Sequence, residues 1–92
     1  MKLEGTIYQR TTAVRTVIVE EQLSDRNFHD QLEHALITLS EQLAVPVPMW
    51  LSVNTREFAR FHHTTFYAEQ FYRPVPFDRL RIRWEPQEGD NL

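Results

Sequence analysis

The sequence contains no cysteine among its 92 residues, which excludes both a disulfide framework and a thiolate metal site. It contains only two glycines, Gly5 and Gly89, so it lacks the glycine-rich loops with which P-loop and dinucleotide-binding proteins cradle phosphate. No apolar run reaches the roughly 18 residues of a membrane span, and no signal-peptide core follows the first residues. These absences predict a cytoplasmic protein without a membrane segment, stabilised by core packing alone.

Lysine is nearly absent, because nine of the ten basic residues are arginine. Thirteen carboxylates outnumber the basic groups and set the net charge at −3, which is unlike the basic charge of most nucleic-acid-binding domains. Arginine suits two-pronged contacts with carboxylate or phosphate and stacking on aromatic rings. The composition therefore indicates one folded domain with structured arginine contacts.

Residues 1–20 predict a β-hairpin, since two segments rich in β-branched residues flank a short polar stretch. No glycine marks the turn, so we expect a loop longer than two residues. Two alternatives remain open for the residues of the second strand that face the core: Ala13, Val17 and Val19, or Val14 and Ile18. A bulge in the strand would let residues of both groups face the core.

Residues 24–44 predict a long amphipathic helix, because apolar residues recur there at a 3.6-residue spacing. Ser24 or Asp25 can cap its start, and Pro46 and Pro48 require it to end near Ala44.

A short helix is predicted over residues 54–61. Asn54 as N-cap and Glu57 at the third helical position would form a capping box, and Val53 with Phe58 would form a hydrophobic staple. Two C-terminal strands follow within residues 62–85, and residues 86–92 are predicted to be a frayed tail.

The element order β-β-α-α-β-β indicates a two-layer α+β domain, with a four-stranded, mostly antiparallel sheet and one long and one short helix. Helices on one side would leave the opposite face of the sheet open.

The stretch "RLRIRW", residues 79–84, alternates arginine with apolar residues, so a strand there places the arginines on one face. We expect this to be the open face, shared with outward residues of the preceding strand. The candidate binding residues on it are Arg79, Arg81, Arg83, Tyr67 and His63.

Two interpretations of these arginines remain open. They form ion pairs with carboxylates of the chain, such as Glu69 if it faces outward on the third strand, or they present a basic, aromatic surface to a partner.

No motif predicts catalysis, a metal site or a cofactor. The serines stand at helix caps or surfaces without a nucleophile elbow, and His29 and His34 lie too far apart around a helix to share a metal. His63, Tyr67 and Glu69 could support acid–base chemistry only if a concave pocket surrounded them.

Ile37 is an apolar residue on the acidic, solvent side of the long helix, and it predicts a secondary patch for a partner or for self-association. Arg60 and Glu69 join the candidate list as polar residues that could hold helix to sheet, with an Arg60–Asp78 pair as the alternative, or could contact a partner.

The C-terminal half resembles a family of small clostridial and related Firmicutes proteins of unknown function. The resemblance rests on the motifs P-x-W-L from Pro48, N-T-x-E-F-A-R-F from Asn54, T-x-F-x-A-E-Q-F from Thr64 and F-D-R from Phe77. It implies a bacterial cytoplasmic protein and carries no activity with it.

The sequence therefore predicts a non-enzymatic interaction or accessory protein that binds a protein partner, and it leaves homo-oligomer formation open. Two alternatives remain: a nucleic-acid-binding module that uses the arginine face, and an inhibitor protein encoded by a mobile element.

Overall fold

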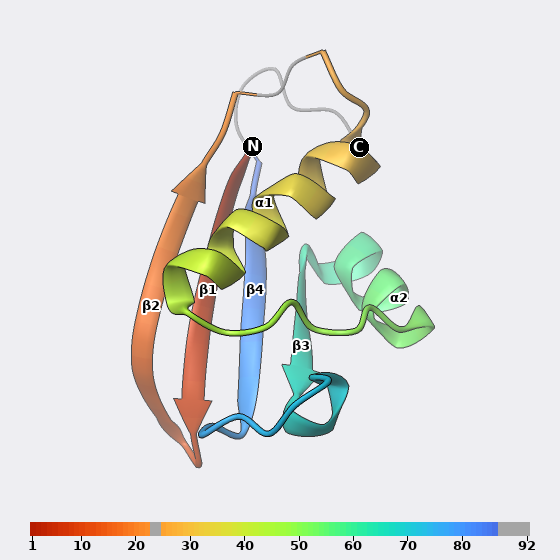
Figure 1. Cartoon of the computed structure of the whole chain (residues 1–92). Coiled ribbons are helices and arrows are strands. Elements are labelled where there is room, and N and C mark those ends of the chain that lie inside the picture. The colour runs from red at the N-terminus through yellow and green to blue at the C-terminus, as the bar shows by residue number, and fades with distance from the viewer. Residues whose placement is uncertain (23–24, 87–92) are drawn as a thin grey trace.

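The computed structural model describes residues 1–22 and 25–86, which form one antiparallel sheet with the long helix across one face (Figure 1). The order of the strands in the sheet is β2-β1-β4-β3. Their bounds are Lys2–Gln9 for β1, Thr12–Glu20 for β2, His63–Tyr67 for β3 and Arg79–Glu85 for β4. The predicted two-layer α+β architecture is confirmed.

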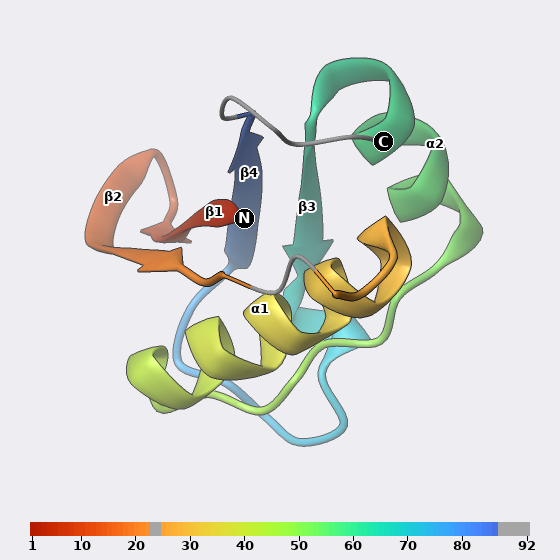
Figure 2. The ribbon, with the colours of Figure 1, turned by 90° about the horizontal axis from the view of Figure 1, so that it is seen from above.

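Two helices and one turn of 3₁₀-helix complete the fold. The long helix α1, Phe28–Leu43, lies across the sheet, and α2, Ser52–Phe61, lies beside β3 at the sheet's edge (Figure 2). The 3₁₀ turn η1, Ala68–Gln70, follows β3 directly, so this strand ends before Glu69. The prediction that Glu69 faces outward from the strand is therefore wrong.

The core lies between the sheet and α1, and the period-2 pattern of β4 explains one side of it. Leu80 and Ile82 are fully buried and Trp84 is 3% exposed, whereas the arginines between them face away. Gly5 lies opposite α1, and a Cβ there would come within 2.5 Å of a methyl carbon of Leu39. The absent side chain allows the helix to approach β1 closely.

The β1–β2 hairpin turns through two residues, Arg10 and Thr11, so the predicted longer loop is wrong. Arg10 adopts a left-handed conformation with φ of 58°, which hairpin turns usually assign to glycine or asparagine. A bulge near Val14 shifts the register, and Val17 packs against the core while Val19 is buried in it. The bulge resolves the ambiguity in the second strand.

Helix α1 begins at Phe28, four residues later than predicted, because Asn27 supplies the cap. The Asn27 Oδ1 accepts a hydrogen bond from the backbone N–H of Asp30 at 2.8 Å. Ser24 and the predicted tail from residue 87 lie outside the described residues. The helix ends at Leu43, close to the end that the prolines predict, and Ala44 caps it in a left-handed conformation.

Helix α2 begins at Ser52, so Asn54 occupies the third helical position and is not the N-cap. Its Oδ1 accepts from the backbone N–H of Leu51 at 2.9 Å, which reverses the predicted roles. Val53 is 39% exposed, so the predicted staple is absent. Glu57 instead accepts a hydrogen bond from Thr64 in β3.

Candidate functional site

The open face of the sheet brings together all five residues of the predicted main site. The register aligns β3 with β4 so that three pairs share this face: His63 with Arg83, Thr65 with Arg81, and Tyr67 with Arg79. On the other side of β4, the corresponding β1 residues are Glu4, Thr6 and Tyr8. The arginines thus form a central stripe along β4, and we call Arg79, Arg81 and Arg83 the arginine stripe.

Arg79 is engaged within the chain. Its guanidinium lies 4.4 Å from the ring centroid of Tyr8, and its Nη1 donates to the backbone carbonyl of Arg10 at 2.8 Å. Asp78, the residue before it, accepts a hydrogen bond from the Arg10 N–H. Together, Asp78 and Arg79 hold the hairpin turn, so this end of the stripe is structural.

Arg81 lies at the centre of the face between two threonines, Thr6 and Thr65. The Thr6 and Thr16 hydroxyls are 3.2 Å apart and share a hydrogen bond. Within residues 1–22 and 25–86, no carboxylate lies within 4.0 Å of the Arg81 guanidinium. As far as the described residues go, the guanidinium has no anionic partner.

Arg83 has a mixed setting, because Glu4 is its neighbour on β1 and His63 its neighbour on β3. No carboxylate of the described chain comes within ion-pair distance of its guanidinium either. The His63 ring stacks on Phe61 with centroids 5.6 Å apart and an interplanar angle of 18°. Phe61 is 53% exposed and extends the site to the end of α2.

Among the described residues, no ion pair joins a carboxylate to the arginine stripe. Glu85 pairs with Lys2 at 3.4 Å at one end of the sheet, away from the central arginine. Glu69 lies on η1 and is exposed, and none of the described ion pairs joins it to an arginine. Of the two interpretations left open by the sequence, pairing with carboxylates of residues 1–22 and 25–86 is the one that the geometry does not support.

A buried polar cluster ties α2 to β3, and sequence reasoning missed it. The Asn54 Nδ2 donates to Thr64 Oγ1 at 2.7 Å and to the Thr65 carbonyl at 3.1 Å, while its Oδ1 also accepts from Gln70 Nε2 at 3.1 Å. The Thr64 hydroxyl donates onward to Glu57 at 2.7 Å. The cluster satisfies its own donors and acceptors, so it is structural.

The spacing of polar residues in N-T-x-E-F and T-x-F-x-A-E-Q was the only sequence signal for this cluster. Capping rules consider only residues within one helix, whereas Asn54 bonds to residues of a strand and of a 3₁₀ turn. Four residues of these motifs, Asn54, Glu57, Thr64 and Gln70, thus serve the attachment of α2.

The predicted secondary patch around Ile37 lies on α1 and not on the open face of the sheet. Ile37 is 38% exposed and lines a shallow hollow of about 150 Å³ with Arg26, Asp30, Glu33 and His34. Near this hollow, His34 contacts Glu21, and Glu33 pairs with His29 at 3.8 Å.

Arg60 lies on α2, 5.4 Å from the ring centroid of Phe61. In the part of the chain that the structure describes, no ion pair joins Arg60 to Glu69 or to Asp78.

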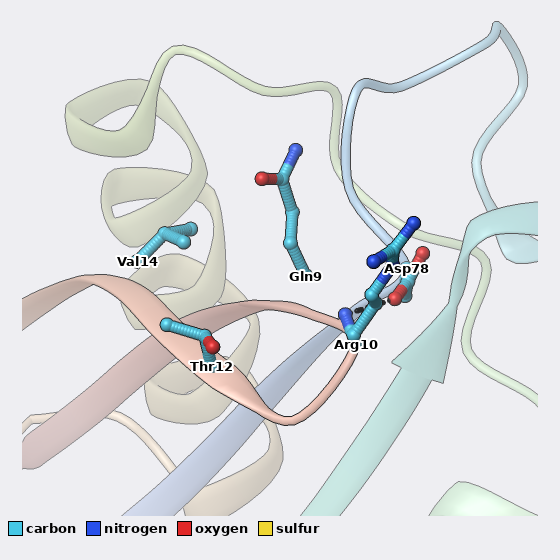
Figure 3. Close-up of a pocket in the computed structure, with 5 residues that line it drawn as sticks. All are labelled: Gln9, Arg10, Thr12, Val14 and Asp78. Carbon is cyan, nitrogen blue, oxygen red and sulfur yellow. Dashed lines mark hydrogen bonds between the residues drawn. The ribbon is translucent and has the colours of Figure 1, made fainter.

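A second hollow, of about 490 Å³, lies at the hairpin turn and is lined by Gln9, Arg10, Thr12, Val14 and Asp78 (Figure 3). The Arg10–Asp78 contact borders it, as the dashed line in Figure 3 shows. Neither hollow is lined by His63, Tyr67 or Glu69, the residues that a catalytic interpretation requires. Among the described residues, no three His, Asp or Glu side chains gather to hold a metal ion.

Comparison of the chain with protein-family models, with curated proteins and with solved structures finds no match. Within the described residues, no helix combines the length and the apolar character that a membrane crossing requires.

Proposed function

We propose that the chain is a small, non-enzymatic binding protein whose open sheet face takes an acidic segment of a protein partner. The observation that carries the proposal is the position of Arg81, which stands between two threonines with no carboxylate partner in the described chain. The Thr65 hydroxyl can donate to an oxyanion, and the buried Thr6 hydroxyl can do so when Thr16 is the donor in the hydrogen bond that the two share. A guanidinium between two hydroxyls matches the chemistry of a carboxylate.

The spacing of the arginine stripe indicates the form of the partner segment. Alternate residues of a strand lie about 6.8 Å apart, and the same repeat separates alternate side chains of any extended peptide. An extended segment with carboxylates at every second position would therefore align them with Arg81 and Arg83. Exposed Tyr67 and Phe61 add apolar contact area at the border of the face.

A nucleic acid fits this face less well. Glu4 and the net charge of −3 disfavour any anionic ligand, but a phosphate backbone carries a charge at every nucleotide and meets more of this repulsion than a segment with spaced carboxylates. The Tyr8 ring is covered by Arg79, which leaves Tyr67 as the exposed ring among the described aromatic residues of the sheet face. Successive bases need several stacking platforms, and this face offers few.

The test is fluorescence anisotropy with two labelled peptides of identical composition. One alternates glutamate with threonine, and the other collects the same glutamates in a block. At about 50 mM salt we expect the alternating peptide to bind several-fold more tightly, and at about 200 mM salt we expect both to weaken through screening. Equal affinity for both peptides would contradict the spacing argument.

The variants decide whether the face is responsible. Replacing both Arg81 and Arg83 by glutamine should weaken binding of the alternating peptide by about tenfold or more, because two charge-assisted contacts are lost. The matched control, Arg56→Gln with Arg73→Gln, removes the same charge from exposed positions outside the stripe and should leave affinity unchanged. An unaffected stripe variant, or no binding at low salt, would overturn the proposal.

A labelled single-stranded oligonucleotide completes the test. If it binds more tightly than the peptide, with a steep salt dependence that the stripe variant abolishes, the face is a nucleic-acid interface and the protein-partner proposal fails.

A further inference from the structure

The two edges of the sheet differ in how they are protected, and the protected edge is β3. Trp84 N–H donates to the His62 carbonyl and Ala68 N–H donates to the Asp78 carbonyl, so residues 63, 65 and 67 direct their backbone groups away from β4. The side chain of Asn54 caps the Thr65 carbonyl at 3.1 Å, and Gln70 Oε1 accepts from the Tyr67 N–H at 2.9 Å. Helix α2 also lies along this edge (Figure 2).

On the opposite edge, β2, Thr16 and Ile18 have no such cover among the described residues. The Glu21 N–H donates to the Met1 carbonyl at 2.8 Å, so the odd-numbered residues of β2 between 15 and 19 bond to β1. The backbone groups of Thr16 and Ile18 therefore point outward. No described helix, loop or side chain forms a hydrogen bond with them from that side.

Two of the usual devices that prevent edge pairing are also missing from the regular part of β2, whose single carboxylate, Glu20, stands at the end of the strand. The strand contains neither lysine nor proline. Its one cation, Arg15, turns back to α1, where its guanidinium donates to the carbonyls of Gln42 at 2.8 Å and Leu43 at 3.3 Å. Ile18 is 51% exposed on this edge, and the bulge near Val14 leaves residues 15–20 regular.

We propose that two copies of the chain pair antiparallel through their β2 edges, around a two-fold axis at Ile18, to form one continuous sheet. The edge is complementary to itself in this register, because Ile18 meets Ile18 of the second copy and Thr16 lies opposite Glu20. No like charges face each other along the shared ladder. An axis at Thr16 would place Ile18 opposite the bulged Val14, where the ladder is irregular.

A two-fold axis perpendicular to the sheet keeps the helices of both copies on one side. The two arginine stripes then lie on the same open surface. The dimer would offer two identical sites to a partner, but its formation does not depend on what the stripes bind.

The test is sedimentation equilibrium of the full chain from about 5 to 200 µM, with a reversible monomer–dimer equilibrium expected for a partly polar contact. Ile18→Lys places two cations at the axis and should raise the dimer dissociation constant by about 100-fold or more. Val14→Lys is the matched control, because Val14 is 50% exposed on the same strand but lies outside the paired segment. It should leave the dimer intact.

Circular dichroism of each variant checks that the fold is retained, and Ile18→Thr serves as a milder second variant. A monomeric chain at about 200 µM would overturn the proposal, since edge pairing should be populated at that concentration. So would a dimer that Ile18→Lys leaves unchanged or that Ile37→Lys disrupts, because the contact would then lie elsewhere.

Discussion

Asn54 is the residue on which the attachment of α2 depends. It is fully buried, and its side chain forms four hydrogen bonds with a helix start, a strand and a 3₁₀ turn. Burial of a side-chain amide destabilises a fold unless all its donors and acceptors form hydrogen bonds, and those of Asn54 do. The same four bonds select one position of α2 relative to β3, which apolar contacts alone would leave less specific.

Substitution of Asn54 by alanine should lower the free energy of unfolding by about 2–4 kcal/mol, because several buried polar groups lose their partners at once. Urea denaturation followed by tryptophan fluorescence measures this change. Asn27→Ala is the control: it removes an exposed helix cap and should cost about 1 kcal/mol. A loss at Asn54 no larger than that of the control would show that the cluster contributes little.

Among the elements, the β1–β2 hairpin turn is unusual because residues outside the hairpin stabilise its geometry. Arg10 has a positive φ, which costs a non-glycine residue about 1–2 kcal/mol. Asp78 and Arg79 compensate by bonding to the Arg10 N–H and carbonyl. Asp78 also donates its backbone N–H to the Tyr8 carbonyl at 3.0 Å, so the start of β4 clamps the turn.

Asp78→Ala should therefore destabilise the protein by about 1–2 kcal/mol, since it removes a charge-assisted bond to a strained turn. In the same background, Arg10→Gly should recover part of the loss, because glycine adopts a positive φ without strain. Thermal unfolding measures both effects, and Glu69→Ala provides an exposed carboxylate as control. Equal stability of Asp78→Ala and the unmodified chain would contradict the clamp.

The elements also show what a sequence can predict. Alternation in β4 and the 3.6-residue spacing of α1 correctly predicted which faces are buried, because periodicity records a residue's environment. The turn at Arg10 was predicted wrongly, because its stabilising groups lie 68 residues away. Likewise, Asn54 fits a local cap in sequence, whereas its partners in β3 and η1 appear only in the folded chain.

The candidate site, too, could be predicted from the sequence only in part. The common face of Arg79, Arg81, Arg83, His63 and Tyr67 followed from alternation and is present in the structure. Alternation could not predict which guanidinium is free, because that depends on strand register. The register places threonines on both sides of the central arginine and a tyrosine beside the first.

At the scale of the whole molecule, the centre of the sheet joins segments from opposite ends of the described chain. Strand β1 begins at Lys2, β4 ends at Glu85, and the two are paired along their length. A fragment of residues 1–77 lacks β4 and should remain unfolded, because β1 and β3 would have no common neighbour. Its amide NMR spectrum measures this, and a well-dispersed spectrum would contradict the expectation.

This pairing has a consequence for the order of events during protein synthesis. A ribosome releases β1, β2 and α1 well before β4, at roughly 5–20 residues per second, so the apolar face of the hairpin waits several seconds for its partner strand. The turn clamp arrives last as well, because Asp78 directly precedes β4. The nascent chain is thus exposed to chaperones and to aggregation until nearly all of the domain has left the exit tunnel.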